Sequence, residues 1–369
     1  MGIIPIQLLK NLTEKGFISS SIPLTEKQFQ PASLDLRIGS KAYRIRSSFL
    51  PQKGSIEDRL KDLFMYEVDL EENGILERGN IYLIPLMEEL NLPDYIRGRT
   101  NPKSTTGRLD IFTRVITDYS HRFEDIDHGY KGKIFLEVVT RSFTVRVKPG
   151  QSLNQLRLFT GNERLNDNEL RTIYDKYSLL YDDNHKPISG RDVKINDGLF
   201  MSINLKRNRL GIIGYKAKKN SAVIDIDRTE FYDASDYWEP IYPPKNDFLI
   251  IEPEEFYIFS SKERVRVPLE YAAEMLEYDA GSGELRTHYA GFFDSGFGYG
   301  ARGEIKGTKA VLEVRPHDVP FRIEDNQIFF KIRYEKMMEQ PLTYYGMDIG
   351  SSYFNQDLTL SKQFKKDDK

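Results

Sequence analysis

The same strand-rich pattern occurs twice in this chain. Leu136-Glu137-Val138 recurs as Leu312-Glu313-Val314, and Gln151 recurs as Gln327, both 176 residues later (312 − 136 and 327 − 151). Three upstream residues recur 175 residues later, namely Glu77, Tyr82 and Pro93 as Glu252, Tyr257 and Pro268. Two copies of one unit account for most of the 369 residues, so the repeat predicts a chain of two similar domains.

Each copy consists of short strand-like segments separated by turn residues. Residues 30–46 alternate between apolar and polar side chains, residues 75–93 divide at Arg78-Gly79-Asn80, and residues 131–159 divide at Pro149-Gly150. Short strands with frequent turns are typical of an all-β barrel or sandwich. We therefore expect a mainly β protein with a few short helices.

Two segments have the spacing of helices. Residues 4–15 place apolar side chains on one helical face, and residues 167–180 follow an N-cap at Asn166-Asp167. The second helix lies in a polar stretch that we interpret as a connector. The predicted organisation is thus an N-terminal unit over residues 1–160, a connector over 161–195 and a C-terminal unit over 196–369.

Composition excludes several classes of function. The net charge is −3, so no overall basic field recruits nucleic acid. The sequence has no apolar run long enough to cross a bilayer, and residues 1–16 lack the pattern of a signal peptide. We expect a cytoplasmic protein without a membrane partner.

The chain contains no cysteine, and its five histidines are scattered. Nucleobase deaminases that use zinc hold it with histidine and cysteine, so this chain cannot build that centre. No histidine pair has the spacing of metal ligands. The sequence therefore predicts no resident metal.

A cluster of cations and hydroxyls lies between residues 97 and 108. Arg97-Gly98-Arg99 is followed by Lys103-Ser104-Thr105-Thr106-Gly107-Arg108. Hydroxyl and backbone N–H groups can donate to a polyphosphate while the cations neutralise it. The order G-x-x-x-x-G-K-[ST] of a P-loop is absent. A solvated turn with ordinary surface cations would have the same composition, so both interpretations stay open.

Each copy also carries a glutamate inside an apolar strand, Glu137 in the first and Glu313 in the second. Such a residue either faces solvent as an ordinary alternating position or faces a closed pocket. A carboxylate in a closed pocket is a candidate general acid or base, because burial favours its protonated form.

These motifs resemble the dCTP deaminase branch of the dUTPase-like, β-clip superfamily, in its long duplicated bacterial form. Residues 92–108 match the family motif that ends Arg-Ser-Ser-x-x-Arg, with Lys103 in place of the first arginine and Ser104, Thr105 and Arg108 at the following positions. Residues 126–138 match the family's I-D-P-G-[WY]-x-G…L-E pattern, which puts Glu137 on the catalytic glutamate. Residues 352–362 resemble the tail that covers the nucleotide, with Tyr353 and Gln356 at its matching positions.

The resemblance implies a zinc-independent hydrolysis of dCTP to dUTP and ammonia, a step of pyrimidine deoxynucleotide metabolism. Glu137 or Glu313 would move protons between water, N3 and the leaving amine, while Arg108 and Ser104 orient the reacting groups. Lys103 and Thr105, with Arg97 and Arg99, would hold the triphosphate. Mg²⁺ would arrive bound to the substrate phosphates, and the family implies a homotrimer.

The second copy departs from the motif. Residues 279–285 retain no cation where the first copy has its phosphate loop, and Glu284 replaces the arginine. Its compact hairpin keeps Ala290, whose carbonyl would hold the water, and Asp294. We therefore hypothesise a composite site that takes the phosphate loop from the first copy and Ala290, Glu313 and the tail from the second.

Three alternatives stay open at this stage. A dUTP pyrophosphatase would use an aspartate such as Asp127 or Asp294, but that branch lacks the strand glutamate. A bifunctional enzyme would release dUMP directly. A nucleotide sensor without catalysis would bind dCTP and release neither product.

Overall fold

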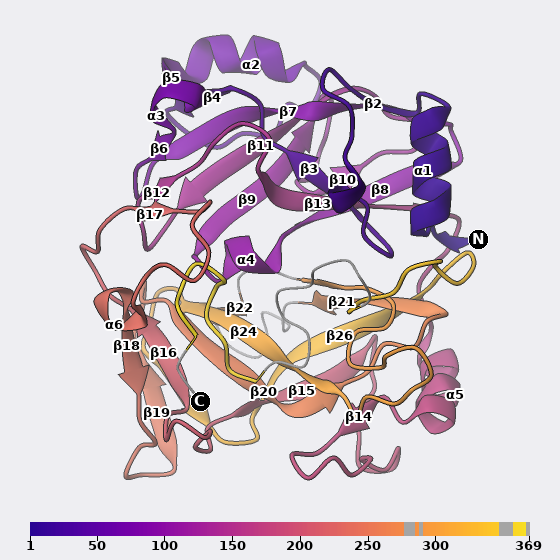
Figure 1. Ribbon diagram of the computed structural model, residues 1–369, viewed down its shortest axis with the longest axis vertical. Helices are drawn as coiled ribbons and strands as arrows, with labels where there is room; N and C mark the ends of the chain where they lie inside the picture. Colours follow the sequence, from indigo (N-terminus) through magenta and orange to yellow (C-terminus); the bar gives the residue numbers. More distant parts are fainter. Residues whose placement is uncertain (277–284, 288–290, 347–356, 367–369) are drawn as a thin grey trace. The chain divides into compact units, whose positions relative to one another are not determined.

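The computed structural model describes residues 1–276, 285–287, 291–346 and 357–366. Most of the regular structure is β-strand, and the helices are short (Figure 1). The expected mainly β fold is confirmed. The expected first helix is observed as α1 (Ile6–Glu14), and the expected second helix as α5 (Asp167–Tyr177), which begins after a capping box between Asn166 and Glu169.

The chain forms two compact units, each with its own strands. The first unit contains residues 1–162, 219–232 and 361–369. One of its sheets has the order β1-β13-β8-β10, with β3 beside β13. A second has the order β5-β4-β7-β11-β9, with β2 beside β7, and a small third sheet has the order β17-β12-β6. The strands of this unit are β1 (Gly2–Ile3), β2 (Ile18–Ser20), β3 (Leu34–Arg37), β4 (Lys41–Ile45), β5 (Phe64–Asp69), β6 (Ile75–Leu76), β7 (Ile81–Asn91), β8 (Ile96–Pro102), β9 (Ile111–Thr117), β10 (Asp125–Ile126), β11 (Lys131–Thr140), β12 (Val145–Arg146), β13 (Ser152–Thr160) and β17 (Ile224–Asp225).

Three further helices belong to the first unit. They are α2 (Ile56–Leu63), α3 (Leu70–Asn73) and α4 (Ser104–Gly107). Helix α2 buries Ile56 against Leu83 and Phe135 of the β7-β11 pair. This packing covers the sheet that carries Glu137.

The second unit contains residues 163–218 and 233–360. Its main sheet runs β18-β16-β20-β15-β26-β21-β23, with β14 and β24 beside β20 and β22 beside β24, while β19 and β25 form a separate pair. Its elements after α5 are β14 (Leu180–Tyr181), β15 (Leu199–Asn204), β16 (Gly214–Ala217), α6 (Ala234–Tyr237), β18 (Trp238–Ile241), β19 (Phe248–Ile251), β20 (Tyr257–Val265), β21 (Tyr271–Leu276), β22 (Leu285–Thr287), β23 (Phe292–Phe293), β24 (Thr308–Pro316), β25 (Phe321–Glu324) and β26 (Ile328–Lys336).

The repeat in the sequence corresponds to a repeat of strands. Strand β13 and strand β26 are offset by 176 residues (328 − 152), as are the first residues of β7 and β20 (257 − 81). Glu137 pairs across the strands with Leu83 in the first unit, and Glu313 pairs with Ile258 in the second. Each glutamate therefore has the same place in its own unit.

The structure groups some segments differently from the sequence interpretation. Helix α5 lies in the expected connector, yet Leu170, Ile173 and Tyr174 on it are part of the core of the second unit. Residues 219–232 follow in the expected C-terminal unit, but they belong to the first unit, where β17 pairs in parallel with β12. Apolar burial explains the first difference, and a pairing distant in sequence explains the second.

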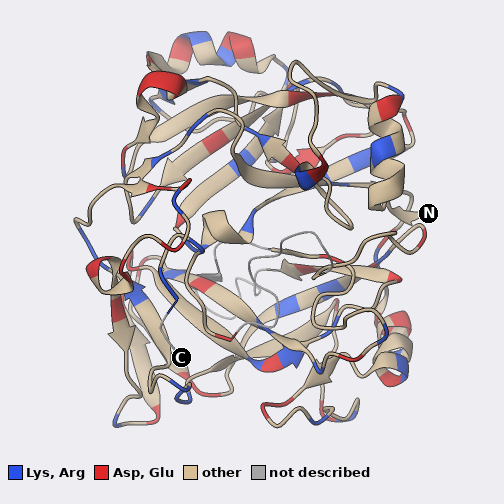
Figure 2. Cartoon of the chain, in the orientation of Figure 1, with Lys and Arg blue, Asp and Glu red and all other residues tan. Residues whose placement is uncertain are grey.

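Figure 2 shows basic and acidic residues interspersed along the strands and helices of both units. Among the described residues, the helices are too short to span a bilayer.

Candidate active site

Residues 103–108 form a tight turn between β8 and β9 in the first unit. The carbonyl of Lys103 accepts hydrogen bonds from the N–H groups of Thr106 at 2.8 Å and Gly107 at 3.0 Å, and Arg108 N–H donates to the Ser104 carbonyl at 3.1 Å. Ser104 is exposed, whereas Arg108 is only 1% exposed. The turn therefore combines an exposed serine with a buried arginine four residues later.

Lys103 is tied to the neighbouring strand β3. Its ammonium forms an ion pair with Oδ2 of Asp35, which is buried. Burial raises the pKa of the Asp35 carboxyl above its ordinary value, and the Lys103 charge opposes that shift. Oδ1 of Asp35 is buried and has no hydrogen-bond partner within the described parts of the chain. The pair fixes the start of the turn and leaves one acceptor oxygen unsatisfied.

A polar cluster beneath the turn links three strands. Asn154 on β13 accepts from Asn101 N–H at 3.2 Å and donates to Thr113 Oγ1 at 3.2 Å. The carboxylate of Glu124 accepts from the Thr100 hydroxyl and from Val115 N–H at 3.1 Å. The residue is partly exposed as a whole, but burial of its carboxyl raises the pKa of Glu124 to about 7.

Glu137 of the first unit is engaged by an arginine. Arg114 on β9 lies opposite Glu137 on β11, and its Nε donates to Oε1 at 3.0 Å. The guanidinium also lies 3.6 Å from the centre of the Phe123 ring and donates to Ser48 Oγ at 2.8 Å. Glu137 is 1% exposed, and its Oε2 lacks a hydrogen-bond partner among the described residues. The structure thus closes this carboxylate inside its own unit.

Glu313 occupies the matching position on β24 of the second unit and is 7% exposed. The second neighbour of the glutamate strand differs between the units. In the first unit β11 pairs with β9, whereas in the second unit β24 pairs with the shorter β22 at Leu285, Arg286 and Thr287. The two strand glutamates therefore share a position in their units, but a different strand lies beside each of them.

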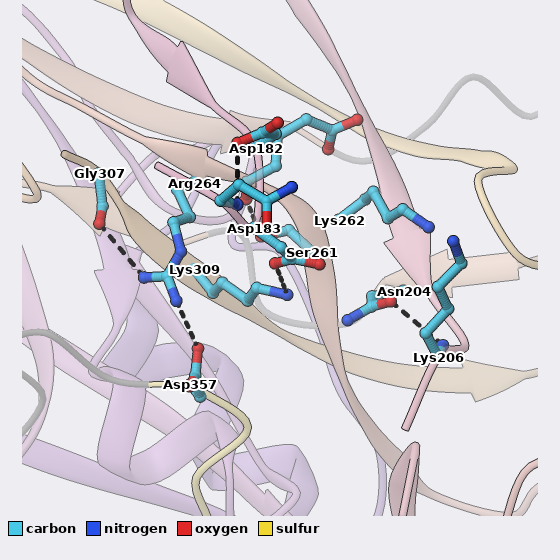
Figure 3. A network of polar contacts seen from close by, with 12 residues as sticks. Asp182, Asp183, Asn204, Lys206, Ser261, Lys262, Arg264, Gly307, Lys309 and Asp357 are labelled. Carbon is cyan, nitrogen blue, oxygen red and sulfur yellow. Dashed lines mark hydrogen bonds and ion pairs between the residues drawn. The ribbon is translucent and has the colours of Figure 1, made fainter. Parts of the chain in front are cut away.

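The second unit holds a charged network next to the C-terminal segment (Figure 3). Arg264 on β20 donates to Oδ1 of Asp357 at 3.1 Å and to the Gly307 carbonyl at 3.5 Å. Its cross-strand partner Lys309 forms an ion pair with Asp183 at 2.7 Å. Both cations are largely buried and paired, so they stabilise the sheet instead of presenting free charge.

The remaining predicted residues lie in several places. Arg97 and Arg99 lie on β8, with their guanidinium carbons 4.4 Å and 5.2 Å from the centre of the Phe159 ring on the neighbouring strand β13. Lys103 is six positions after Arg97, about 20 Å at the usual rise, so the structure does not bring Arg97 to the turn. Asp294 is 8% exposed beside β23 of the second unit. Ala290, Tyr353 and Gln356 lie outside the described residues.

No group of three or more His, Asp or Glu side chains suited to a metal occurs within the parts of the chain that the structure describes. The cations and hydroxyls at residues 103–108 are instead donors, which suit phosphate oxygens.

Sequence reasoning missed Asp35 and Arg114 as parts of these surroundings. Asp35 lies in the alternating segment 30–46, which predicts a strand but no partner, and its ion pair with Lys103 joins positions 68 residues apart. Arg114 lies on β9, and the sequence does not specify the β9-β11 register that puts it opposite Glu137.

The chain thus consists of two repeated mainly β units, one with a cation-and-hydroxyl turn and both with a buried strand glutamate. Family models agree: residues 1–162 match the N-terminal domain of 2'-deoxycytidine 5'-triphosphate deaminase, and residues 166–364 match its C-terminal domain. The chain belongs to the dCTP deaminase family of hydrolytic enzymes.

One solved structure and several individual relatives are similar to this chain. A crystal structure of 2'-deoxycytidine 5'-triphosphate deaminase from Agrobacterium tumefaciens is 42% identical, with a TM-score of 0.85 over 91% of this chain and 99% of that chain. A "dCTP deaminase, dUMP-forming" of Methanosphaera stadtmanae is 30% identical over 159 residues, which are 42% of this chain and 78% of the relative. A "dCTP deaminase" of Haloarcula marismortui is 28% identical over 153 residues, which are 40% of this chain and 75% of the relative.

Proposed function

We propose that this enzyme deaminates dCTP by hydrolysis and releases dUTP and ammonia. The observation that carries the proposal is the turn at residues 103–108, which contains the exposed Ser104 and the buried Arg108 in a chain of the dCTP deaminase family. A hydroxyl and fixed cations can bind phosphate oxygens and leave the base to a second group of residues.

The triphosphate would be held by the first unit. Lys103, Thr105 and Arg108 supply two charges and a hydroxyl, and Ser104 adds a further hydroxyl at the surface. Mg²⁺ would enter as the complex with the substrate, because this ion is usually bound through phosphates and water with few carboxylates. Arg99, four positions before Lys103, would add a further charge, and Arg97 would act by long-range attraction from the start of β8.

Proton transfer would be carried by Glu313. Water adds to C4 of the cytosine, and a carboxylate accepts its proton, passes it to N3 and then delivers a proton to the amine that leaves as ammonia. Such a group must reach both water and base. Glu137 is 1% exposed and its carboxylate forms an ion pair with Arg114, whereas Glu313 is 7% exposed, and we therefore assign proton transfer to Glu313.

Both units would then be needed for turnover, since the first retains the cations of the turn at residues 103–108 and the second supplies Glu313. We further propose a closed homo-oligomer, with a trimer as the expected state. Light scattering on the purified protein measures its mass directly, and a monomer at micromolar concentration would contradict this part of the proposal.

The decisive experiment incubates the purified protein with dCTP and Mg²⁺ and follows ammonia and nucleotide products together. A parallel sample is first treated with a zinc chelator. Equimolar ammonia and dUTP in both samples supports the proposal. Loss of activity after zinc removal would contradict it.

A second candidate is release of dUMP and pyrophosphate after deamination. The printed names of several relatives, among them the Methanosphaera stadtmanae protein, favour it. Asp127, which is exposed in the turn before β11, is a candidate to activate water at the α-phosphate. The same assay separates the two products. Tight binding of dCTP without ammonia would instead favour a sensor.

A further inference from the structure

A short segment from the far end of the sequence is fixed against the phosphate-binding turn within the first unit. The hydroxyl of Ser361 donates to the carbonyl of Thr105 at 3.1 Å. The single hydrogen of this hydroxyl is shared with Oε1 of the buried Gln363 at 2.6 Å, and Nε2 of Gln363 donates to the Ile226 carbonyl at 2.8 Å. The backbone around residue 362 is therefore held beside the turn by specific bonds on both sides.

Aromatic packing fixes the next residue as well. Phe364 is 3% exposed and forms a bridge with Tyr232, whose ring centre lies 6.3 Å away. Buried residues at 361, 363 and 364 surround a single exposed one, Lys362. Three buried side chains thus anchor this segment, and Lys362 lies at its surface.

Two carboxylates of the first unit interact with the charge of Lys362. Its ammonium interacts electrostatically with Asp35 of β3 and with Asp227, both in the first unit. Asp35 is the ion-pair partner of Lys103, while Asp227 also binds Lys148 at 3.1 Å and Gln151 at 3.0 Å. Lys362 therefore follows a residue that is bonded to Thr105, two positions from Lys103, and its charge acts on the same carboxylate as that of Lys103.

We propose that Lys362 is a further phosphate-binding residue, which places a cation beside the turn at residues 103–108 and contacts the terminal phosphates of the nucleotide. The inference rests on the proposed function and deepens it. Asp35 neutralises part of the Lys103 charge, and Ser104 and Thr105 are uncharged. A further cation would therefore strengthen the binding of a triphosphate at this turn. Lys362 can supply that cation, because the residue before it is bonded to the turn.

The test compares Lys362→Gln with Lys362→Arg and with a matched control, Lys366→Gln. Lys366 lies four residues further along, is 77% exposed in its side chain and pairs with Glu230 at 2.6 Å, so its replacement removes the same charge away from the turn. We expect Lys362→Gln to raise the KM for dCTP about fivefold with kcat within about twofold. Lys362→Arg and Lys366→Gln should stay close to the unchanged protein.

Inhibition by inorganic tripolyphosphate gives a readout independent of the base. Its inhibition constant should rise about fivefold in Lys362→Gln and stay constant in Lys366→Gln, and both effects should shrink as salt is added. Melting temperatures equal to that of the unchanged protein establish that the variants fold.

The outcomes separate this inference from the proposed function. If the unchanged protein releases ammonia from dCTP, and Lys362→Gln matches Lys366→Gln in KM and in tripolyphosphate inhibition, the role of Lys362 is wrong and the function stands. If the unchanged protein releases no ammonia, the function is wrong. Calorimetric binding of tripolyphosphate to the same variants then decides the role of Lys362 by itself.

Discussion

Arg114 on β9 lies directly across the strand pair from Glu137 on β11, and its Nε binds the carboxylate at 3.0 Å. The same guanidinium rests on the Phe123 ring at 3.6 Å. A carboxylate held in this way has a structural partner within its own unit, and at the matching place in the second unit the short strand β22 takes the position of β9. The repeat has therefore kept the residue while its surroundings diverged.

The first prediction concerns the two strand glutamates. Glu313→Gln should lower kcat by about 10²–10⁴-fold, because it removes the proposed proton carrier. Glu137→Gln should retain turnover within a few-fold but lower the melting temperature, because Arg114 loses its charged partner. Ammonia release and thermal unfolding measure both. Inactive Glu137→Gln beside active Glu313→Gln would reverse the assignment.

A second prediction concerns Lys103 and Asp35. Lys103→Gln should raise the KM for dCTP about tenfold, since a phosphate-binding cation is lost. Asp35→Asn keeps Lys103 and removes only its partner, so its effect on KM should be smaller. The double variant completes a cycle, and the KM of Lys103→Gln should persist in it if the lysine binds phosphate. Recovery of the normal KM in the double variant would mean that Lys103 serves only to neutralise Asp35.

The third prediction is a pH dependence of stability from Glu124. Burial raises the pKa of this carboxyl to about 7, above its ordinary value of 4.5. Between these values the folded state holds a proton that the unfolded state has released. The contribution of Glu124 to the free energy of unfolding is therefore complete below about pH 4.5, falls as the pH rises, and is lost above about 7.

Glu124→Gln provides the test, because its amide can donate to Thr100 while its oxygen accepts from Val115 N–H, as the protonated acid does. Urea unfolding measures the free energy of unfolding at pH 5.5 and at pH 8. The difference between these two free energies should be smaller in the variant than in the unchanged protein. An equal difference in both proteins would exclude Glu124 as the source.

A fourth prediction concerns the buried ion pair between Arg37 on β3 and Glu88 on β7, whose Nε and Oε1 atoms are 2.7 Å apart. Glu88 is fully buried and also accepts from Gln28 at 3.0 Å. Glu88→Gln leaves a buried guanidinium without its counter-charge and should cost about 3–5 kcal/mol of unfolding free energy. Glu26→Gln removes an exposed partner of Lys10 and should change the free energy of unfolding by less than about 1 kcal/mol. Comparable losses in both variants would contradict this explanation.

The sequence predicted those parts of the fold that depend on local patterns. The turn at Arg78-Gly79-Asn80 separates β6 from β7, with Gly79 at a φ of +78° that favours glycine. The cap at Asn166 begins α5 as expected, and a left-handed Ser178 ends it near the predicted residue. Turn and capping residues act over a few positions, so a sequence carries their signal directly.

Features that join distant positions could not be predicted in the same way. The parallel pair of β12 and β17 joins Val145 to Ile224, and the Ser361–Thr105 bond spans 256 residues. Such contacts depend on how the chain returns through space, which alternation and turn residues do not specify. Of the site, the turn at residues 103–108 and both glutamates followed from motifs, but their partners Asp35 and Arg114 required the strand register.

Residues 219–232 and 361–366 complete the first unit, although they follow the start of the second in the chain. A ribosome must therefore synthesise nearly the whole chain before the first unit has all its parts. Cutting the gene between the two copies, near codon 162, would leave the first without β17 and without the segment that bonds Thr105. The boundary between the two copies in the sequence is therefore not the boundary between the two units in space.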